Sequence, residues 1–183
     1  MVKSSRGITL PFPDLEESEQ LDLLWRVLSY DPETGDFHWL VHSGSRGAKG
    51  TKAGTLGSDG HIYIKLGRRF AAHRLAWLYM YKHWPKDQID HINGIGNDNK
   101  LSNLREATHA QNMRNNLGWE TKRNGSLKGA YLNKKSNYWY SMIMVEGKNI
   151  YLGKFSTEEE AHETYVAASR KYHGEFSNTG RLQ

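Results

Sequence analysis

A polar segment containing glycine divides the chain, and this segment constrains the fold more than any other feature. Residues 114–127 (RNNLGWETKRNGSL) are basic and show no sustained hydrophobic periodicity, which is typical of a connector between domains. In a chain of 183 residues, the parts on either side are each long enough for only a modest hydrophobic core. We therefore expect two small domains with a boundary near Glu120: a first domain over residues 1–119, a linker over 120–127 and a second domain over 128–183.

Composition excludes several classes of protein. The chain has no cysteine, which rules out disulfides, iron–sulfur clusters, zinc ribbons and thiol nucleophiles, so oxygen and imidazole are left to hold any metal. No stretch approaches the roughly 20 consecutive apolar residues that span a bilayer, and the first residues lack the pattern of a secretory signal. We expect a soluble, cytoplasmic protein without a membrane partner.

Charge is unevenly distributed along the chain. Residues 1–40 carry 3 basic and 8 acidic groups, residues 41–119 carry 12 and 5, and residues 120–183 carry 10 and 7, giving net charges of −5, +7 and +3. A basic middle section suits a polyanion, because neutralising phosphates releases counterions. A solvated basic surface explains the charge equally well, so charge alone leaves both interpretations open.

Hydrophobic periodicity predicts a mixture of short elements in the first part. Leu21, Leu24, Trp25 and Leu28 recur at helical spacing, and a turn over residues 31–35 precedes a short strand over 37–39. Alternating residues 62, 64 and 66 predict a strand ahead of a Gly67-Arg68 turn. The segment 73–83 (HRLAWLYMYKH) predicts a helix that stops before Trp84-Pro85.

The second part predicts three strands and a helix. Residues 130–133, 138–146 and 149–155 are rich in aromatic and branched side chains and are separated by turn signals. Thr157 and Glu160 form a capping-box pattern for the helix that follows. The helix would cover the sheet with a narrow stripe formed by Ala161, Tyr165, Ala168 and Tyr172.

The segment 89–112 (IDHINGIGNDNKLSNLREATHAQN) contains the most specific residues of the chain. Asp90-His91, Asn103-Leu104-Arg105 and residues 108–112 resemble the HNH endonucleases, in particular the phage and intron-homing branch in which asparagine replaces the final histidine. The segments YDPETGDFHW and AHRLAW extend the resemblance to residues 25–116, with an HNH core at about 70–116. The resemblance implies an α+β protein with a ββα-metal (His-Me finger) nuclease domain, encoded by a phage and acting in a bacterial host cell.

The chemistry of these residues suits hydrolysis of a phosphodiester. Imidazole has an ordinary pKa near 6.5, so His91 is a candidate general base. Asp90 and Asn112 offer hard oxygen donors, a sparse set that suits one Mg²⁺ ion, or Mn²⁺, because such an ion retains waters and takes phosphate oxygens. The amide oxygen of Asn103 would accept from one N–H of His91 and orient the ring, although Asn103 could instead cap a turn.

The spacing raises one difficulty. Adjacent residues of a regular strand point to opposite faces, so Asp90 and His91 share one site only if the chain is irregular there, and we predict such an irregularity. We expect Asn112 in the second turn of a helix that begins with a Thr108–Gln111 capping box.

The other histidines receive no catalytic role. His73 precedes an apolar helix and is interpreted as a core or cap residue, with a phosphate contact as the alternative. None of the rest shows the ligand spacing of a zinc site. They are His38, His42, His61, His83, His109, His162 and His173.

Residues 126–179 resemble the AP2 DNA-binding domain, a three-stranded antiparallel sheet backed by one helix. The matching residues are Lys128-Gly129, Trp139, the run 151–155, Glu158, Glu159, Ala161 and the stretch 174–178. Strand alternation places Tyr131, Asn133, Lys135, Tyr140, Met142, Met144, Asn149 and Tyr151 on the outward face that would enter the major groove. On this face the chain has Met and Tyr where plant AP2 sheets have arginines. The alternative to a DNA-binding domain is therefore a small interaction module with a Tyr and Met surface.

Together the two resemblances predict a metal-dependent endonuclease that binds double-stranded DNA as a monomer or weak dimer. One alternative is a catalytically inactive DNA-binding protein. Another is a protein-binding scaffold, and only this scaffold would lack salt-dependent DNA affinity. Basic residues of both domains are expected to contact DNA phosphates. They are Arg68, Arg69, Arg105, Arg114, Lys134, Lys135 and Lys148.

Overall fold

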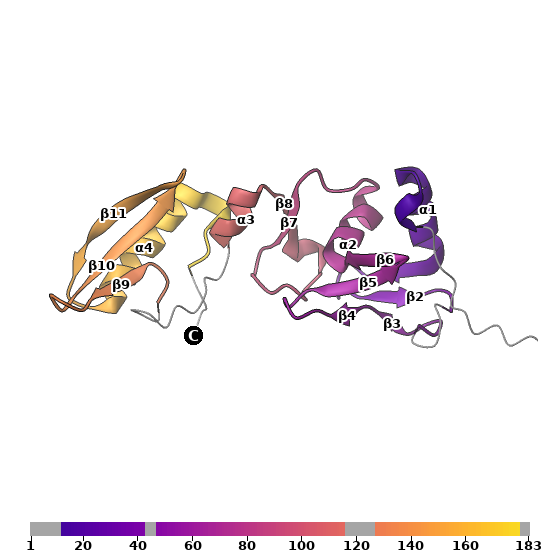
Figure 1. Ribbon diagram of the computed structural model, residues 1–183, viewed down its shortest axis with the longest axis horizontal. Helices are drawn as coiled ribbons and strands as arrows, with labels where there is room; N and C mark the ends of the chain where they lie inside the picture. Colours follow the sequence, from indigo (N-terminus) through magenta and orange to yellow (C-terminus); the bar gives the residue numbers. More distant parts are fainter. Residues whose placement is uncertain (1–11, 43–46, 116–126, 180–183) are drawn as a thin grey trace, which may run out of the picture. The chain divides into compact units, whose positions relative to one another are not determined.

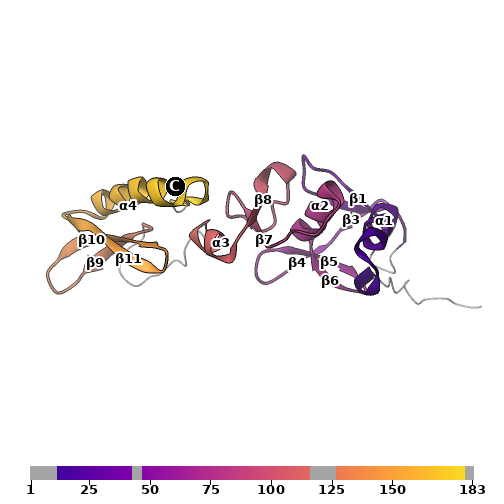
Figure 2. The same ribbon diagram turned by 90° about the horizontal axis from the view of Figure 1, so that it is seen from above.

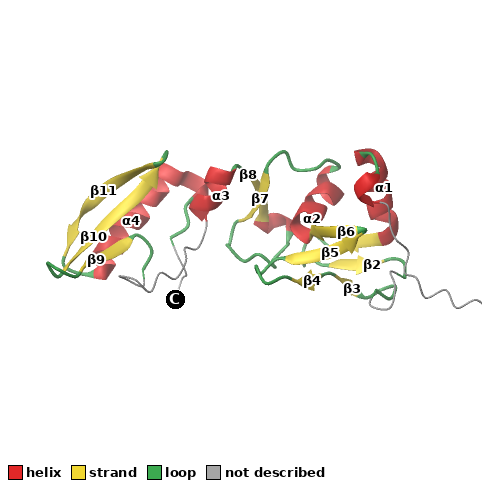
Figure 3. Cartoon of the chain, in the orientation of Figure 1, coloured by secondary structure: helices red, strands yellow, loops and turns green. Residues whose placement is uncertain are grey.

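The computed structural model describes residues 12–42, 47–115 and 127–179. The chain divides into two compact units, Met1–Thr108 and His109–Gln183, which are described separately below (Figure 1). Both contain helices and strands, which confirms the predicted α+β class (Figure 3). The predicted boundary near Glu120 lies outside the described residues and stays a prediction.

The first unit combines helices with two small three-stranded sheets and a two-stranded hairpin. Its helices bury Leu24 and Leu75 together with Phe12 in one core. No described helix is long and apolar enough to cross a membrane. The elements are η1 (Phe12–Asp14), α1 (Glu17–Val27), β1 (Leu28–Tyr30), β2 (Phe37–Trp39), β3 (Lys52–Ala53), β4 (Thr55–Leu56), β5 (Ile62–Leu66), β6 (Arg68–Ala71), α2 (Ala72–Tyr81), β7 (Gln88–His91), η2 (Leu101–Asn103) and β8 (Leu104–Ala107).

The local predictions for this unit are largely confirmed. The strands over 37–39 and 62–66 are β2 and β5, and the sheets have the orders β1-β2-β3 and β4-β5-β6. Helix α2 ends at Tyr81, because Lys82 takes a left-handed conformation (φ 65°) ahead of Trp84-Pro85. Of the four apolar residues at helical spacing, Trp25 is 36% exposed and Leu28 begins β1 instead of continuing the helix, whereas Val27 is buried.

A separate two-stranded hairpin carries the segment of greatest interest. Strands β7 and β8 pair antiparallel from Gln88 opposite Ala107 to His91 opposite Leu104. Between them a loop over residues 92–100 returns the chain through η2. The hairpin therefore places residues 90 and 91 beside the loop that follows them.

In the second unit a helix covers one face of a three-stranded antiparallel sheet with the order β11-β10-β9 (Figure 2). The three predicted strands and the predicted helix are confirmed. Ser141 pairs with Gly153 and Met142 with Tyr151, which leaves Leu152 as the extra residue of a bulge. The elements are α3 (His109–Asn115), β9 (Ala130–Asn133), β10 (Tyr138–Val145), β11 (Lys148–Phe155), α4 (Glu158–His173) and η3 (Gly174–Phe176).

Helix α4 begins with the predicted capping box. Thr157 Oγ1 accepts from the N–H of Glu160, and the Glu160 carboxylate accepts from the N–H of Thr157. Ala161, Tyr165 and Ala168 are buried as predicted, but Tyr172 is 41% exposed and that part of the prediction is wrong. At the end of the helix Ser169 and His173 are buried instead, because a straight helix over a twisted sheet shifts its contact stripe.

Candidate active site

Strand β7 brings Asp90 and His91 into the interior by a regular pleat. Both side chains are buried, and β7 pairs with β8 through both residues without a register shift. The predicted irregularity at this step is therefore wrong. The physical reason is that both faces of the hairpin are covered, so adjacent residues that point to opposite faces are both buried.

Asp90 is held by its cross-strand partner. Arg105 lies opposite Asp90 in the register, and its Nε donates to Asp90 Oδ2 at 2.8 Å while Nη2 lies 2.8 Å from the same oxygen. Opposite charges on facing residues of an antiparallel pair stabilise the hairpin. The structure thus places Arg105, predicted to contact DNA, against the predicted metal ligand.

The carboxylate of Asp90 is a hard oxygen donor of the kind that Mg²⁺ takes. Arg105 contacts Oδ2 through both Nε and Nη2, so a divalent ion at Asp90 would share the carboxylate with the guanidinium. The donor chemistry of Asp90 fits the predicted ion.

His91 is positioned by Asn99. Its Nε2 lies 3.0 Å from Asn99 Oδ1, and both residues are buried. An amide oxygen accepts, so the ring carries its proton on Nε2 and its lone pair on Nδ1. Burial lowers the pKa of His91, the hydrogen bond to Asn99 opposes this, and the nearby His61 lowers it further. The ring is therefore neutral at physiological pH, as a general base must be.

The prediction that Asn103 orients His91 is wrong. Asn103 Oδ1 accepts from the N–H of Asn93, and its Nδ2 donates to Asn93 Oδ1 and to the Asp98 carbonyl. Asn103 closes the loop, which is the turn-capping alternative. Sequence reasoning missed Asn99 because the loop offers Asn93, Asn97, Asn99 and Asn103 with no pattern to distinguish them.

The N-terminal hairpin supports Asn99 from behind. The Tyr30 hydroxyl donates to the Asn99 carbonyl at 2.7 Å, and the N–H of Leu101 donates to the Pro32 carbonyl at 3.0 Å. Burial raises the pKa of Tyr30, so the hydroxyl keeps its proton. Gly35 has φ +77°, and a Cβ there would clash with the backbone of Asn99 and Lys100. The β1–β2 turn thus sets the position of the residue that holds His91.

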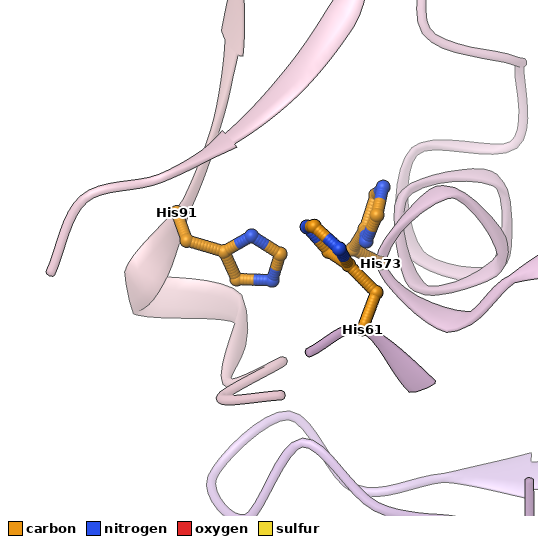
Figure 4. Close-up of side chains that lie close together, drawn as sticks. All are labelled: His61, His73 and His91. Atoms are coloured by element: carbon orange, nitrogen blue, oxygen red, sulfur yellow. The ribbon is translucent and has the colours of Figure 1, made fainter. Parts of the chain in front are cut away.

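Two histidines from other elements lie beside His91 (Figure 4). Ring centroids are 5.0 Å apart for His73 and His91, 5.5 Å for His61 and His91, and 5.2 Å for His61 and His73. Burial, with the nearby His91 and His61, lowers the pKa of His73 to about 3. His73 is thus a packed interior histidine, as predicted. His61 had been given no role, and no local pattern identifies it.

The remaining predicted residues of the site fall in other places. Asn112 lies in α3, which begins directly after Thr108 as predicted but belongs to the second unit, so its role as a metal ligand stays a prediction. The side chain of Arg114 lies outside the described residues. Arg68 and Arg69 are exposed on β6, where they stack over Phe70 at 5.0 Å and Tyr63 at 4.3 Å.

The sheet face opposite α4 carries a row of tyrosines. Tyr131 stacks on its register partner Tyr140 with centroids 5.5 Å apart, and Tyr140 lies 6.5 Å from Tyr151. Lys154 Nζ lies 4.1 Å from the centre of the Tyr138 ring. Sequence reasoning omitted both Tyr138 and Lys154. Alternation with Tyr140 was enough to find Tyr138, whereas the bulge at residue 152 hid Lys154.

The other predicted sheet residues divide into exposed and structural positions. Asn133 is structural, since its Oδ1 accepts from the N–H groups of Lys135 and Ser136 and closes the turn after β9. Met142 is half-buried. The exposed ones are Lys134, Lys135, Met144, Lys148, Asn149 and Tyr151.

Comparison with known proteins is informative for one segment. Residues 70–114 match the family HNH_3, described as HNH endonuclease. These residues include Asp90, His91, Asn99 and Asn103, so the chain contains an HNH endonuclease domain and is an enzyme of the nuclease class.

Matches to whole proteins are weaker. A search of curated proteins found no significant match. Among solved structures, the chain is similar to one described as "DNA binding and cleavage by the HNH homing endonuclease I-HmuI", with 20% identity, 80% of this chain and 85% of that chain covered, and a TM-score of 0.38. A TM-score this low does not establish a common fold over the whole chain.

Proposed function

Proceeding from the HNH endonuclease match over residues 70–114, we propose that this protein hydrolyses DNA phosphodiester bonds with His91 as the general base. The observation that carries the proposal is the buried His91, held neutral and oriented by Asn99 within the matched segment. A neutral imidazole with a fixed tautomer accepts a proton from water at Nδ1, and the product is a nick or a double-strand break.

A divalent ion, Mg²⁺ or Mn²⁺, belongs to this proposal. Asp90 and Asn112 would hold it, and when bound it would stabilise negative charge on the phosphate oxygens. Because β7 is regular at residues 90 and 91, the ion at Asp90 would act from the opposite face of the strand to His91. The residues of the chain have their own tasks. Arg105 holds the Asp90 carboxylate in place, and Asn103 keeps the loop closed so that Asn99 faces His91.

DNA recognition is proposed for the second unit, as the AP2 resemblance implies. The support is the sheet face opposite α4, which carries stacked tyrosines, with the exposed lysines Lys134, Lys135 and Lys148 around it. Lysines bind phosphates without reading sequence, whereas Tyr and Met side chains contact base edges and deoxyribose. We therefore propose binding of double-stranded DNA by a monomer or weak dimer, with tolerant sequence recognition.

The test uses supercoiled plasmid with Mg²⁺, with Mn²⁺ and with EDTA, and follows conversion to nicked and linear forms. Wild type is expected to cut only with a divalent ion, and His91→Ala to lose cleavage while remaining folded and keeping its DNA affinity. His83→Ala is the matched control, because His83 is an exposed histidine of the same unit.

Two outcomes contradict the proposal. Cleavage by His91→Ala at the wild-type rate would remove His91 from the chemistry. DNA binding without cleavage under every metal condition would favour the catalytically inactive DNA-binding protein instead.

A further inference from the structure

The three histidines around His91 come from three separate elements. His61 immediately precedes β5, His73 lies in the first turn of α2, and His91 ends β7. One ligand nitrogen from each lies within 4.8 Å of the other two, and Figure 4 shows the rings converging. Three histidines that are far apart in the sequence therefore form a compact set of nitrogen donors.

His61 and His73 each carry a ring nitrogen that lacks a hydrogen bond. Nδ1 of His61 and Nδ1 of His73 are buried, and neither has a hydrogen-bond partner. Asp59 Oδ2 is 3.4 Å from Nδ1 of His61, but it is not aligned for a hydrogen bond. A buried polar atom without a partner costs about 1–3 kcal/mol. A ligand that used these lone pairs would remove that cost.

The imidazole nitrogens determine which class of metal ion could bind. Zn²⁺, Co²⁺, Ni²⁺ and Cu²⁺ accept several imidazoles, whereas Mg²⁺ requires oxygen. Tetrahedral Zn²⁺ with Zn–N bonds of about 2.0–2.1 Å separates its nitrogens by roughly 3.3 Å. The rings therefore need to approach by roughly 1.5 Å at most, which is within the reach of side-chain rotation at the half-buried His61.

We propose that His61, His73 and His91 bind one transition-metal ion of the Zn²⁺ class, and that this ion inhibits DNA hydrolysis. The inhibitory part rests on the proposed function of His91. A neutral imidazole has one nitrogen lone pair, so a His91 that coordinates a metal cannot accept a proton from water. The ion is distinct from the one assigned to Asp90 and Asn112, because its ligands are all nitrogen.

Metal binding is measured first, independently of cleavage. Full-length protein without a histidine tag is stripped with EDTA, dialysed, and titrated with Co²⁺ for visible absorption and with Zn²⁺ for stoichiometry, each with excess Mg²⁺ present. Wild type is expected to bind one ion per chain. His61→Asn and His73→Asn are each expected to lose at least about tenfold in affinity, since even an outer ligand partner contributes that much.

Two kinds of control accompany the titration. His83→Asn removes an exposed histidine of the same unit and is expected to bind like wild type. Gly96→Ala retains all three ligands but places a Cβ 3.0 Å from Cδ2 and Nε2 of His61, so it should weaken binding by moving the ring. Gly96→Ala keeps the test decisive if a histidine variant fails to fold.

Inhibition is measured for each variant as the ratio of two plasmid-cleavage rates in Mg²⁺, one with one equivalent of Zn²⁺ and one without it. Wild type is expected to lose most of its activity when Zn²⁺ is added. The residual activity of His61→Asn is expected to be unchanged by Zn²⁺.

Equal metal affinity in wild type, His61→Asn and His73→Asn, or no Co²⁺ or Zn²⁺ bound by wild type, would overturn the site. Binding of one ion without loss of cleavage would overturn the inhibition, whereas absence of all cleavage would refute the proposed function and leave the metal site standing.

Discussion

At the scale of single residues, catalysis is predicted to depend on Asn99. Asn99→Ala removes the acceptor at 3.0 Å from His91 Nε2 and leaves the ring free to rotate or change tautomer. We expect kcat to fall by about 10–100-fold, the usual effect of losing an orienting partner, with DNA affinity unchanged. Single-turnover cleavage and a binding titration measure the two quantities separately.

The matched control is Asn97→Ala, two residues away in the same loop and exposed. It should cleave like wild type. An equal loss of kcat in Asn99→Ala and Asn97→Ala would show that any change in this loop impairs cleavage, and would contradict a specific role for Asn99.

The stability of the first unit is predicted to depend on pH through His73. Its pKa is about 3 in the folded chain and about 6.5 when unfolded, so below pH 6.5 the unfolded chain takes up a proton that the folded chain excludes. Stability is therefore complete above pH 6.5 and is lost as the pH falls toward 3. At pH 5 the loss from His73 is about 2 kcal/mol, which urea unfolding with EDTA at pH 7 and pH 5 can measure.

His73→Gln cannot take up this proton, so its free energy of unfolding should change less between the two pH values than that of wild type. An identical change in both proteins would contradict a depressed pKa for His73.

Which residues form the site was only partly readable from the sequence. Asp90 and His91 are marked by an unusual local pattern, but the pattern led to a predicted irregularity where the strand is regular. Asn99 and His61 are not so marked, because their roles arise from contacts made 8 and 30 positions away from His91 and not from local periodicity. Long-range convergence of this kind leaves no trace in the spacing of a single sequence.

At the scale of elements, the β1–β2 hairpin is predicted to position the loop that holds His91. Gly35→Ala meets two costs: a left-handed backbone at φ +77° and a clash with the backbone of Asn99 and Lys100. The first costs about 1–2 kcal/mol, and the second displaces the loop. We expect a loss of more than about 2 kcal/mol in unfolding free energy together with reduced kcat.

Gly50→Ala is the matched control, because Gly50 has φ +85° and nothing within 4 Å of its added Cβ. It should cost only the backbone strain and leave cleavage unchanged. If the two variants lose equal stability and neither loses activity, the hairpin does not support the site.

Regular elements are the part of the fold that local patterns predict well. The three strands and the capping box of α4 follow from alternation and from Thr157 and Glu160, both local signals. The predicted burial of Tyr172 is wrong because burial at the end of a helix depends on sheet twist, which residue spacing does not encode. Lys154 was omitted from the outward face for a related reason, since one bulge reverses the alternation of the residues after it.

At the scale of the whole molecule, the proposal divides the work between a unit that cuts and a unit that binds. The first unit carries the buried chemistry around His91, and the second carries an exposed face of tyrosines and lysines. Composition predicted this division only coarsely, since residues 41–119 and 120–183 carry net charges of +7 and +3, which places basic groups on both sides of the predicted boundary. Which unit dominates DNA affinity is therefore a quantitative question.

Salt dependence of DNA binding answers it. Each lysine that neutralises a phosphate adds about 0.9 to the slope of log K against log salt, so Lys134→Gln with Lys148→Gln should reduce that slope by roughly 1.8. Lys171→Gln is the matched control, because Lys171 lies at the end of α4, which packs on the sheet face opposite Tyr131, Tyr140 and Tyr151. A slope that is unchanged by the sheet lysines but reduced by Arg68→Gln with Arg69→Gln would place DNA binding on the first unit, and the second unit would then be the small interaction module that its Tyr and Met surface also suits.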